Sequence, residues 1–139
     1  VLPCVHPHTN TTIMYENEID FIMQNTDPEL VGFAPDTAHL LAASCDPVEI
    51  CERYQDRIAF THIKDVSGPA ESVGMQDGVE VYSNFLELGT GNVDFDGVFQ
   101  VYKRCGYEGF LCLELDVPPV SNRQSAERNL NFIKKHWIW

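Results

Sequence analysis

Short apolar runs alternate along the chain with segments in which apolar residues recur at helical spacing. The runs are rich in Val, Ile, Phe and Leu, and this alternation predicts four successive strand–helix units around a parallel sheet. The strands are expected at residues 1–6, 31–35, 58–63 and 110–115. The helices are expected at residues 16–25, from residue 46 onward, at 94–105 and at 121–137.

Local signals support several of these boundaries. The sequence Asp46-Pro47-Val48-Glu49 combines a helix N-cap, a proline in the first turn and a capping-box glutamate. Gly106 suits the end of the third helix, whereas Pro3 is unfavourable inside the first strand. Residues 65–92 are too many for an ordinary strand-to-helix connection, which predicts a functional or disordered loop.

Composition narrows the class of protein. With 139 residues, of which 44% are hydrophobic, the chain can bury one core. Nine Lys and Arg stand against 21 Asp and Glu, and the resulting net charge of -12 argues against nucleic acid as a partner. No apolar run approaches the ~20 residues that span a bilayer, so no membrane association is expected.

The cysteines and the start of the chain give two further expectations. The five cysteines show no CxxC spacing and lie mostly in apolar runs, which favours small buried thiols and a reducing, cytoplasmic location. The chain opens on Val1-Leu2-Pro3 without Met or a polar lead, so we expect a preceding segment.

Each predicted strand ends in side chains that can do chemistry. In a parallel barrel the catalytic groups lie at the C-terminal ends of the strands, where the loops leave an open mouth. The candidates, in strand order, are His6 and His8, Asp36 and His39, His62 and Lys64, and Glu114. Imidazole nitrogens and carboxylate oxygens together favour Mn²⁺, Co²⁺, Zn²⁺ or Fe²⁺ over Mg²⁺ as a cofactor.

Purely structural interpretations compete with these. A lone histidine at a strand end is more often a hydrogen-bonded structural residue, and for His8 alone we favour that reading. Asp36 could cap a turn, and Lys64 could be a solvated cation at the rim as readily as a substrate contact. Gly89-Thr90-Gly91 lacks the spacing of a nucleotide-binding loop. Cys4 with His6 and His8 could instead form half of a structural zinc site, although no partner pair is evident.

Five segments, in order along nearly the whole chain, resemble the second half of inosose dehydratases within the xylose isomerase-like TIM-barrel family. They are His-Pro-His-Thr-Asn-Thr (6–11), Asp-Thr-Ala-His (36–39), Asp-Arg-Ile-Ala-Phe-Thr-His-Ile-Lys-Asp-Val (56–66), Gly-Thr-Gly-Asn-Val-Asp-Phe (89–95) and Gly-Tyr-Glu-Gly-Phe-Leu-Cys-Leu-Glu (106–114). The resemblance implies a (β/α)₈ barrel, of which residues 1–139 form the last four units of a single domain. Ala38 and the pair Leu115-Asp116 depart from the usual dehydratase pattern, which leaves the exact substrate open.

The resemblance also implies a ligand set. It places three metal ligands on Asp36, His62 and Glu114. The family's remaining Glu ligand is replaced at the first strand end by His6 and His8, either of which could serve, and the fourth position is assigned to His6.

The chemistry expected of such a site is proton transfer next to a ketone. A divalent metal lowers the barrier to removing the α-proton by stabilising an enediolate, and the outcome is isomerisation, epimerisation or dehydration. We expect a metal-dependent dehydratase or isomerase that acts on an uncharged keto-polyol or keto-sugar. Glu114, Lys64 and His39 are the catalytic candidates, and His8, His39 and Lys64 the substrate-binding candidates.

Three alternatives remain beside an inosose dehydratase-like activity. One is a sugar or sugar phosphate isomerase or epimerase, and another is an inactive half-barrel with only a role in assembly. A metal-dependent endonuclease of the same barrel family is disfavoured by the acidic charge. Because four units are half of a closed barrel, the expected protein partner is the missing N-terminal half-barrel or a second copy of the chain.

Overall fold

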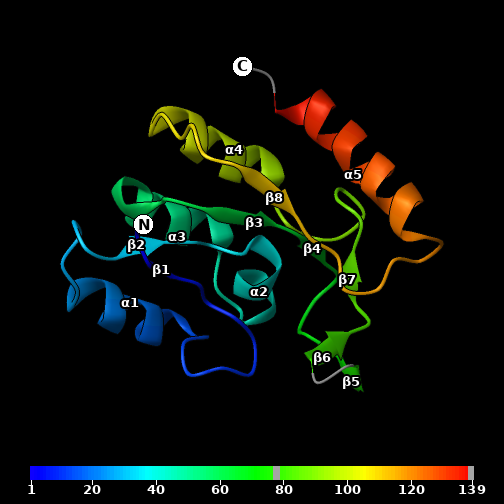
Figure 1. Cartoon of the computed structure of the whole chain (residues 1–139), viewed down its shortest axis with the longest axis horizontal. Helices are drawn as coiled ribbons and strands as arrows, with labels where there is room; N and C mark the ends of the chain where they lie inside the picture. Colours follow the sequence, from blue (N-terminus) through cyan, green and yellow to red (C-terminus); the bar gives the residue numbers. More distant parts are fainter. Residues whose placement is uncertain (77–78, 138–139) are drawn as a thin grey trace.

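Four short parallel strands form the centre of the computed structural model, which describes residues 1–76 and 79–137 (Figure 1). The strands are β1 (Cys4–Val5), β2 (Gly32–Phe33), β3 (Thr61–Ile63) and β8 (Leu111–Leu113). β1 pairs with β2 and β3 with β8, and isolated parallel bridges from Phe33 to Ile58 and from Asp36 to His62 join the two pairs. The predicted parallel arrangement of four strand–helix units is confirmed.

The strands are shorter than the apolar runs that predicted them. Pro3 and Pro35 flank β1 and β2 and accept hydrogen bonds through their carbonyl groups, from Gly32 and His62, but have no N–H to continue the ladder. The strand ends therefore pass early into the loops that carry the candidate residues.

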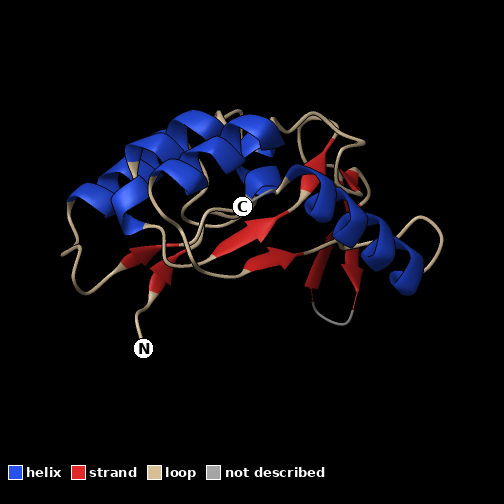
Figure 2. Ribbon diagram, turned by 90° about the horizontal axis from the view of Figure 1, so that it is seen from above, coloured by secondary structure: helices blue, strands red, loops and turns tan. Residues whose placement is uncertain are grey.

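Helices cover one side of these strands, as Figure 2 shows. The four predicted helices are α1 (Glu16–Gln24), α3 (Pro47–Arg53), α4 (Phe95–Arg104) and α5 (Asn122–His136). A 3₁₀ turn, η1 (Gln55–Arg57), follows α3. Asp46 caps α3 by accepting from the N–H groups of Val48 and Glu49, and Gly106 adopts a positive φ of 67° just beyond α4, as predicted.

The short helix α2 (Thr37–Ala42) was not predicted from the sequence. It follows β2 directly and has only six residues, so its apolar positions show no extended helical period. Its N-cap is Asp36, and Thr37 accepts a hydrogen bond from the Lys64 N–H at 3.0 Å. α2 therefore holds the end of β2 against the end of β3.

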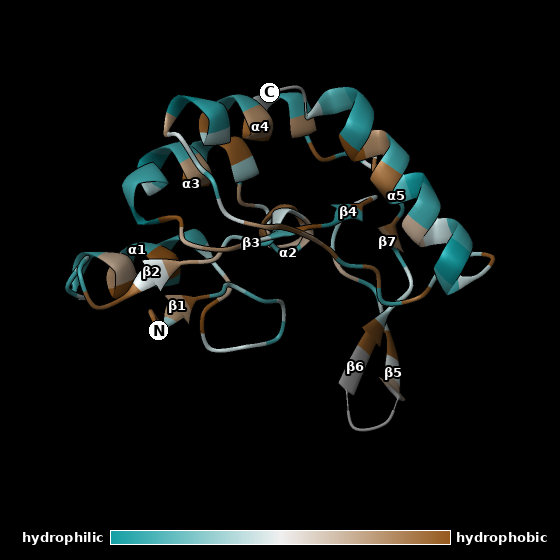
Figure 3. Ribbon diagram, turned by 45° about the horizontal axis from the view of Figure 1, so that its top comes forward, coloured by the Kyte–Doolittle hydropathy of each residue, from teal (hydrophilic) through white to brown (hydrophobic). Residues whose placement is uncertain are grey.

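Alternation along β3 separates a helix-facing side from a concave side. Ile63 belongs to the main core with Val98, Phe99 and other residues of α4, and the Thr61 hydroxyl lies 3.1 Å from the Tyr102 hydroxyl. The His62 side chain points to the opposite, concave side of the strands. The outer faces of the helices are largely polar (Figure 3), as expected for helices that surround a barrel.

The described part of residues 65–92 contains regular secondary structure. It forms two antiparallel pairs, β4 (Asp65–Val66) with β7 (Phe85–Leu86) and β5 (Ser72–Gln76) with β6 (Val79–Tyr82), the second projecting as a hairpin (Figure 3). Residues 77–78 of the predicted loop lie outside the described residues.

Asp65 ties the two ends of this segment together. Its carboxylate accepts hydrogen bonds from the backbone N–H groups of Val66, Gly89, Gly91 and Val93, at 2.8–3.2 Å. Gly89 also has a positive φ of 79°. The Gly-Thr-Gly sequence thus closes this segment on a buried carboxylate.

The cysteines are less uniformly buried than the sequence predicted. All five cysteines are free, with Cys45 and Cys51 buried and the other three partly exposed. Among the described residues, no helix combines the length and the apolar character needed to cross a bilayer.

Candidate metal centre

Three predicted ligands from three neighbouring strand ends converge on one point. His6 follows β1, Asp36 follows β2 and His62 lies in β3, and one ligand atom from each lies within 4.8 Å of the other two. The parallel bridge between Asp36 and His62 fixes these two residues side by side. The strand ends therefore bring together residues that are 26 or more positions apart in sequence.

Asp36 uses its two carboxylate oxygens differently. Oδ1 caps α2 by accepting from the N–H groups of Ala38 and His39, at 2.9 and 3.0 Å. Oδ2 is buried and has no hydrogen-bond partner among the described residues. The interpretation of Asp36 as a turn cap is thus correct for one oxygen, and the other remains free for a cation.

His62 is the second buried polar group without a satisfied hydrogen bond. Its Nδ1 lies 3.6 Å from Asp36 Oδ2 and 2.8 Å from Glu114 Oε2, but neither approach has hydrogen-bond geometry. The carboxylates of Asp36 and Glu114 raise the pKa of His62 to about 10. Burial raises the pKa of Asp36, but His62, His39 and Lys64 outweigh it and bring the value to about 2.

His6 completes the group of three. Its Nδ1 donates to the Ala34 carbonyl oxygen at 2.9 Å, which orients the ring and leaves Nε2 as a lone-pair donor. The ring centroids of His6 and His62 are 4.7 Å apart. Burial lowers the pKa of His6, which favours the neutral imidazole that metals bind.

This donor set fits a divalent transition metal. A buried carboxylate oxygen and a buried imidazole nitrogen, both without partners, are costly unless a cation or ordered water satisfies them. Two imidazoles and a carboxylate suit Zn²⁺ and its neighbours in the first transition row. Glu114 lies beside the group rather than within it, and its contact with His62 lowers the pKa of the Glu114 carboxyl to about 2.

The structure separates the two histidines that the sequence left as alternatives. His6 lies with Asp36 and His62, whereas His8 donates from Nδ1 to the Thr9 carbonyl oxygen at 2.8 Å. The His8 ring lies against the His39 ring at a tilt of 32°, with 3.6 Å between ring centroids. The assignment of the fourth ligand to His6 rather than His8 therefore stays a prediction with structural support.

Lys64 is a buried cation among carboxylates. Its Nζ lies 3.0 Å from Asp116 Oδ1, 3.3 Å from Glu114 Oε1 and 3.9 Å from Asp36 Oδ2. Burial lowers the pKa of Lys64, but the three carboxylates outweigh it and raise the value above the usual range. The Lys64 side chain is 1% exposed, so it is not the solvated rim cation that the sequence left open.

His39 lies beside Lys64, with 3.5 Å between Nε2 and Nζ. The hydroxyl of Thr9 lies 2.8 Å from its Nδ1, and burial lowers the pKa of His39 to about 3. Tyr82 and Phe85, from the segment between β3 and α4, stand edge-on to the His39 ring, with centroids 6.0 and 4.8 Å away.

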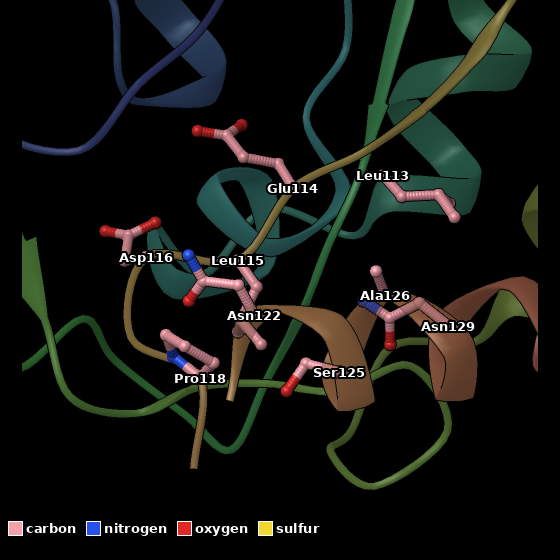
Figure 4. A pocket seen from close by; sticks show the side chains of 9 residues that line it. All are labelled: Leu113, Glu114, Leu115, Asp116, Pro118, Asn122, Ser125, Ala126 and Asn129. Carbon is pink, nitrogen blue, oxygen red and sulfur yellow. The ribbon is translucent and has the colours of Figure 1, made fainter. Parts of the chain in front are cut away.

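Two cavities lie near these residues. One, of about 490 Å³, is lined by His6, His8, Thr11, Thr12 and Ile13 and opens over the histidines. The other, of about 310 Å³, lies between the end of β8 and α5 (Figure 4). In that view the carboxylates of Glu114 and Asp116 point away from α5, and none of the four clustered histidines lines this cavity. Glu114 and Asp116 line the second cavity, whereas His6 and His8 line the first, which we take as the candidate substrate site.

Comparison with protein families decides which group of proteins this arrangement represents. The sequence pattern of the family described as xylose isomerase-like TIM barrel matches residues 1–136. The chain belongs to this family. Within the xylose isomerase-like family, inosose dehydratase from Lacticaseibacillus casei is 33% identical over 119 residues, which cover 82% of this chain and 40% of that protein.

Solved structures agree on the fold. A D-tagatose 3-epimerase-like protein superposes with a TM-score of 0.71 at 18% identity and covers 99% of this chain and 47% of its own. The IOLI protein with a bound zinc atom gives 0.69 at 17% identity, over 97% and 49%. The chain thus spans less than half of the length of each of these proteins, which confirms that it is a partial barrel.

Sequence reasoning missed several residues that the structure places at the site. Thr9 lies inside the recognised His-Pro-His-Thr segment but was given no role, and Asp116 was noted only as a departure from the dehydratase pattern. Tyr82 and Phe85 carried no signal, because they belong to the long segment whose path no local periodicity dictates.

Proposed function

We propose that the protein is a divalent-metal-dependent lyase or isomerase that acts on an uncharged keto-polyol or keto-sugar, with dehydration of an inosose as the preferred reaction. The observation that carries the proposal is the group formed by His6, Asp36 and His62, in which two buried polar atoms lack partners. The inosose dehydratase relatives and the zinc bound to the IOLI neighbour support the choice.

Asp36, His62 and Glu114 would hold the metal, with His6 as the fourth ligand. When bound, the metal would act as a Lewis acid that holds a ketone oxygen with its neighbouring hydroxyl and stabilises the charge that develops as the α-proton leaves. The two carboxylates of this ligand set carry negative charge, whereas imidazoles that bind a metal are neutral. The cation would balance that charge.

The remaining side chains would move and direct protons. Glu114, whose side chain is partly exposed, would in addition accept the proton from the α-carbon. Lys64, which three neighbouring carboxylates keep charged despite its burial, would donate a proton to a departing β-hydroxyl, which leaves as water while the carbon–carbon double bond forms. Without that loss, return of the proton to another carbon or face gives isomerisation or epimerisation at the same site.

The acidic mouth favours an uncharged substrate. Lys64 is the cation that approaches the candidate ligands, and Asp116, Glu114 and Asp36 already surround it. A phosphate or carboxylate group would add negative charge beside these three carboxylates. Neutral hydroxyl and ketone oxygens avoid this repulsion.

Mass spectrometry of the reaction in D₂O tests the proposal. The protein at its natural full length, supplied with Mn²⁺, Co²⁺ or Zn²⁺, is expected to convert 2-keto-myo-inositol to a product lighter by one water. Chelation should stop the reaction and added metal restore it. A product that has lost no water but carries deuterium in place of a carbon-bound hydrogen would identify an isomerase or epimerase instead. Metal-bound protein that neither releases water nor exchanges deuterium with any keto-polyol would overturn the proposed function.

A further inference from the structure

Thr9 contacts His39 through two different hydrogen-bond donors. Its hydroxyl oxygen lies 2.8 Å from His39 Nδ1, and its backbone N–H donates to the same nitrogen at 3.3 Å. A backbone N–H can only donate, so Nδ1 must accept. In a neutral imidazole the ring hydrogen then lies on Nε2.

The surroundings keep the ring in this orientation. The His8 ring lies against His39 at a tilt of 32°, and the Phe85 ring stands edge-on to it at 4.8 Å. The Tyr82 hydroxyl lies 3.5 Å from the Thr9 carbonyl oxygen, to which it donates, and thereby fastens the loop that carries Thr9. Thr9 is 1% exposed and His39 2%, so water has little access to compete for Nδ1.

On its other side the ring faces the candidate metal centre. Nε2 lies 4.0 Å from Asp36 Oδ2 and 3.5 Å from Lys64 Nζ. An ammonium group, like the Nε2–H of this tautomer, can only donate hydrogen bonds. Two donors therefore stand side by side next to the unpartnered oxygen of Asp36, and neither can accept from the other.

We propose that Thr9 is a positioning residue that holds His39 as the Nε2–H tautomer, so that His39 and Lys64 present adjacent donors to a single substrate oxygen. The substrate part rests on the proposed function, whereas the tautomer does not. The paired donors select a ketone, hydroxyl or alkoxide oxygen at this point and reject an amine in its ammonium form, which has no lone pair to offer.

Nitrogen NMR of histidine-labelled, zinc-loaded protein at full length tests the tautomer directly, with the His39 signals assigned from their loss in His39→Gln. We expect a protonated Nε2 and an unprotonated Nδ1 in the wild type and in Thr9→Ser, which keeps the hydroxyl. Thr9→Val should shift the signals toward a mixture of tautomers. A wild-type ring protonated at Nδ1, or a Thr9→Val spectrum identical to the wild type, would overturn the proposal.

Kinetics test the donor role. The amide nitrogen of glutamine can stand near the position of Nε2, and that of asparagine near Nδ1. We expect His39→Gln to keep kcat/KM within about 10-fold of the wild type. His39→Asn misplaces the donor and Thr9→Val lacks the hydroxyl, so each of these two variants should lose about 10-fold or more in kcat/KM. Thr9→Ser should restore activity, and all of these variants should retain metal.

The outcomes separate the two levels of inference. Equal losses in His39→Gln and His39→Asn, with metal retained, would show that an Nε2 donor is not what the site requires. If the wild type binds metal but turns over no keto-polyol, the proposed function fails while the NMR result still decides the tautomer. If Thr9→Val fails to fold, the wild-type spectrum and the two His39 variants decide the proposal.

Discussion

Replacing Asp36 with asparagine is expected to abolish retention of the divalent metal and, with it, turnover. Oδ2 of Asp36 is buried, unpartnered and the central carboxylate of the candidate ligand group. An asparagine oxygen can still cap α2 at the position of Oδ1, but the charged ligand is lost. Metal affinity should fall by more than roughly 100-fold, beyond the effect of removing an outer partner of a ligand. Equilibrium dialysis with elemental analysis measures this directly.

A cap at another helix supplies the matched control. Asp46 caps α3 in the same way as Asp36 caps α2, through N–H groups two and three residues later, but it lies outside the ligand group. Asp46→Ala should lower the free energy of unfolding by about 0.5–2 kcal/mol and leave metal content unchanged. If Asp36→Asn keeps its metal, or if Asp46→Ala loses it equally, the assignment of Asp36 as a ligand is wrong.

The 139 residues by themselves are expected to self-associate and to be inactive. β1 pairs only with β2, and β8 only with β3, so the outer edge of each strand has no partner strand among the described residues. Apolar side chains accompany these edges, with Phe110 82% exposed and Leu2 42%. Unpaired parallel strands favour pairing with another chain, and closing a barrel removes both edges.

A second copy can satisfy both edges through a two-fold axis along the barrel. β8 of one copy would then lie parallel to β1 of the other, and the same contact would repeat on the opposite side. The candidate ligands would occur twice around one mouth whose shape is wrong for a specific polyol. We expect dimers or larger species by analytical ultracentrifugation, with no turnover. A compact monomer that dehydrates inosose would contradict both parts.

Hydrophobic periodicity and helix-capping residues were together sufficient to predict most of the helices and strands. α3 and α4 begin where Asp46 and Asp94 predict them, because side-chain caps mark a helix start locally. α2 could not be predicted in this way, since six residues make less than two turns and the helix depends on its contacts with Lys64 and the end of β3. The strand pairs within residues 65–92 likewise depend on Asp65, whose role is set by tertiary contacts.

Sequence analysis predicted the site residues whose positions follow from the strand topology. It missed those whose positions follow from the packing of loops. His6, Asp36 and His62 could be grouped from sequence because the ends of neighbouring parallel strands must meet at one mouth. Thr9 and Tyr82 could not, because their contacts with His39 and with each other depend on how two loops fold against one another. From the sequence, a helix cap and a metal ligand were competing interpretations of Asp36. In the structure one carboxylate oxygen caps α2 and the other is the candidate ligand.

Anomalous diffraction from crystals of the zinc-loaded, full-length protein, measured on both sides of the zinc absorption edge, tests the central claim most directly. A single strong peak at bonding distance, about 2 Å, from His6 Nε2, Asp36 Oδ2, His62 Nδ1 and a Glu114 carboxylate oxygen is the predicted result. A peak elsewhere on the chain, or a fully ordered site without one at saturating zinc, would contradict the account.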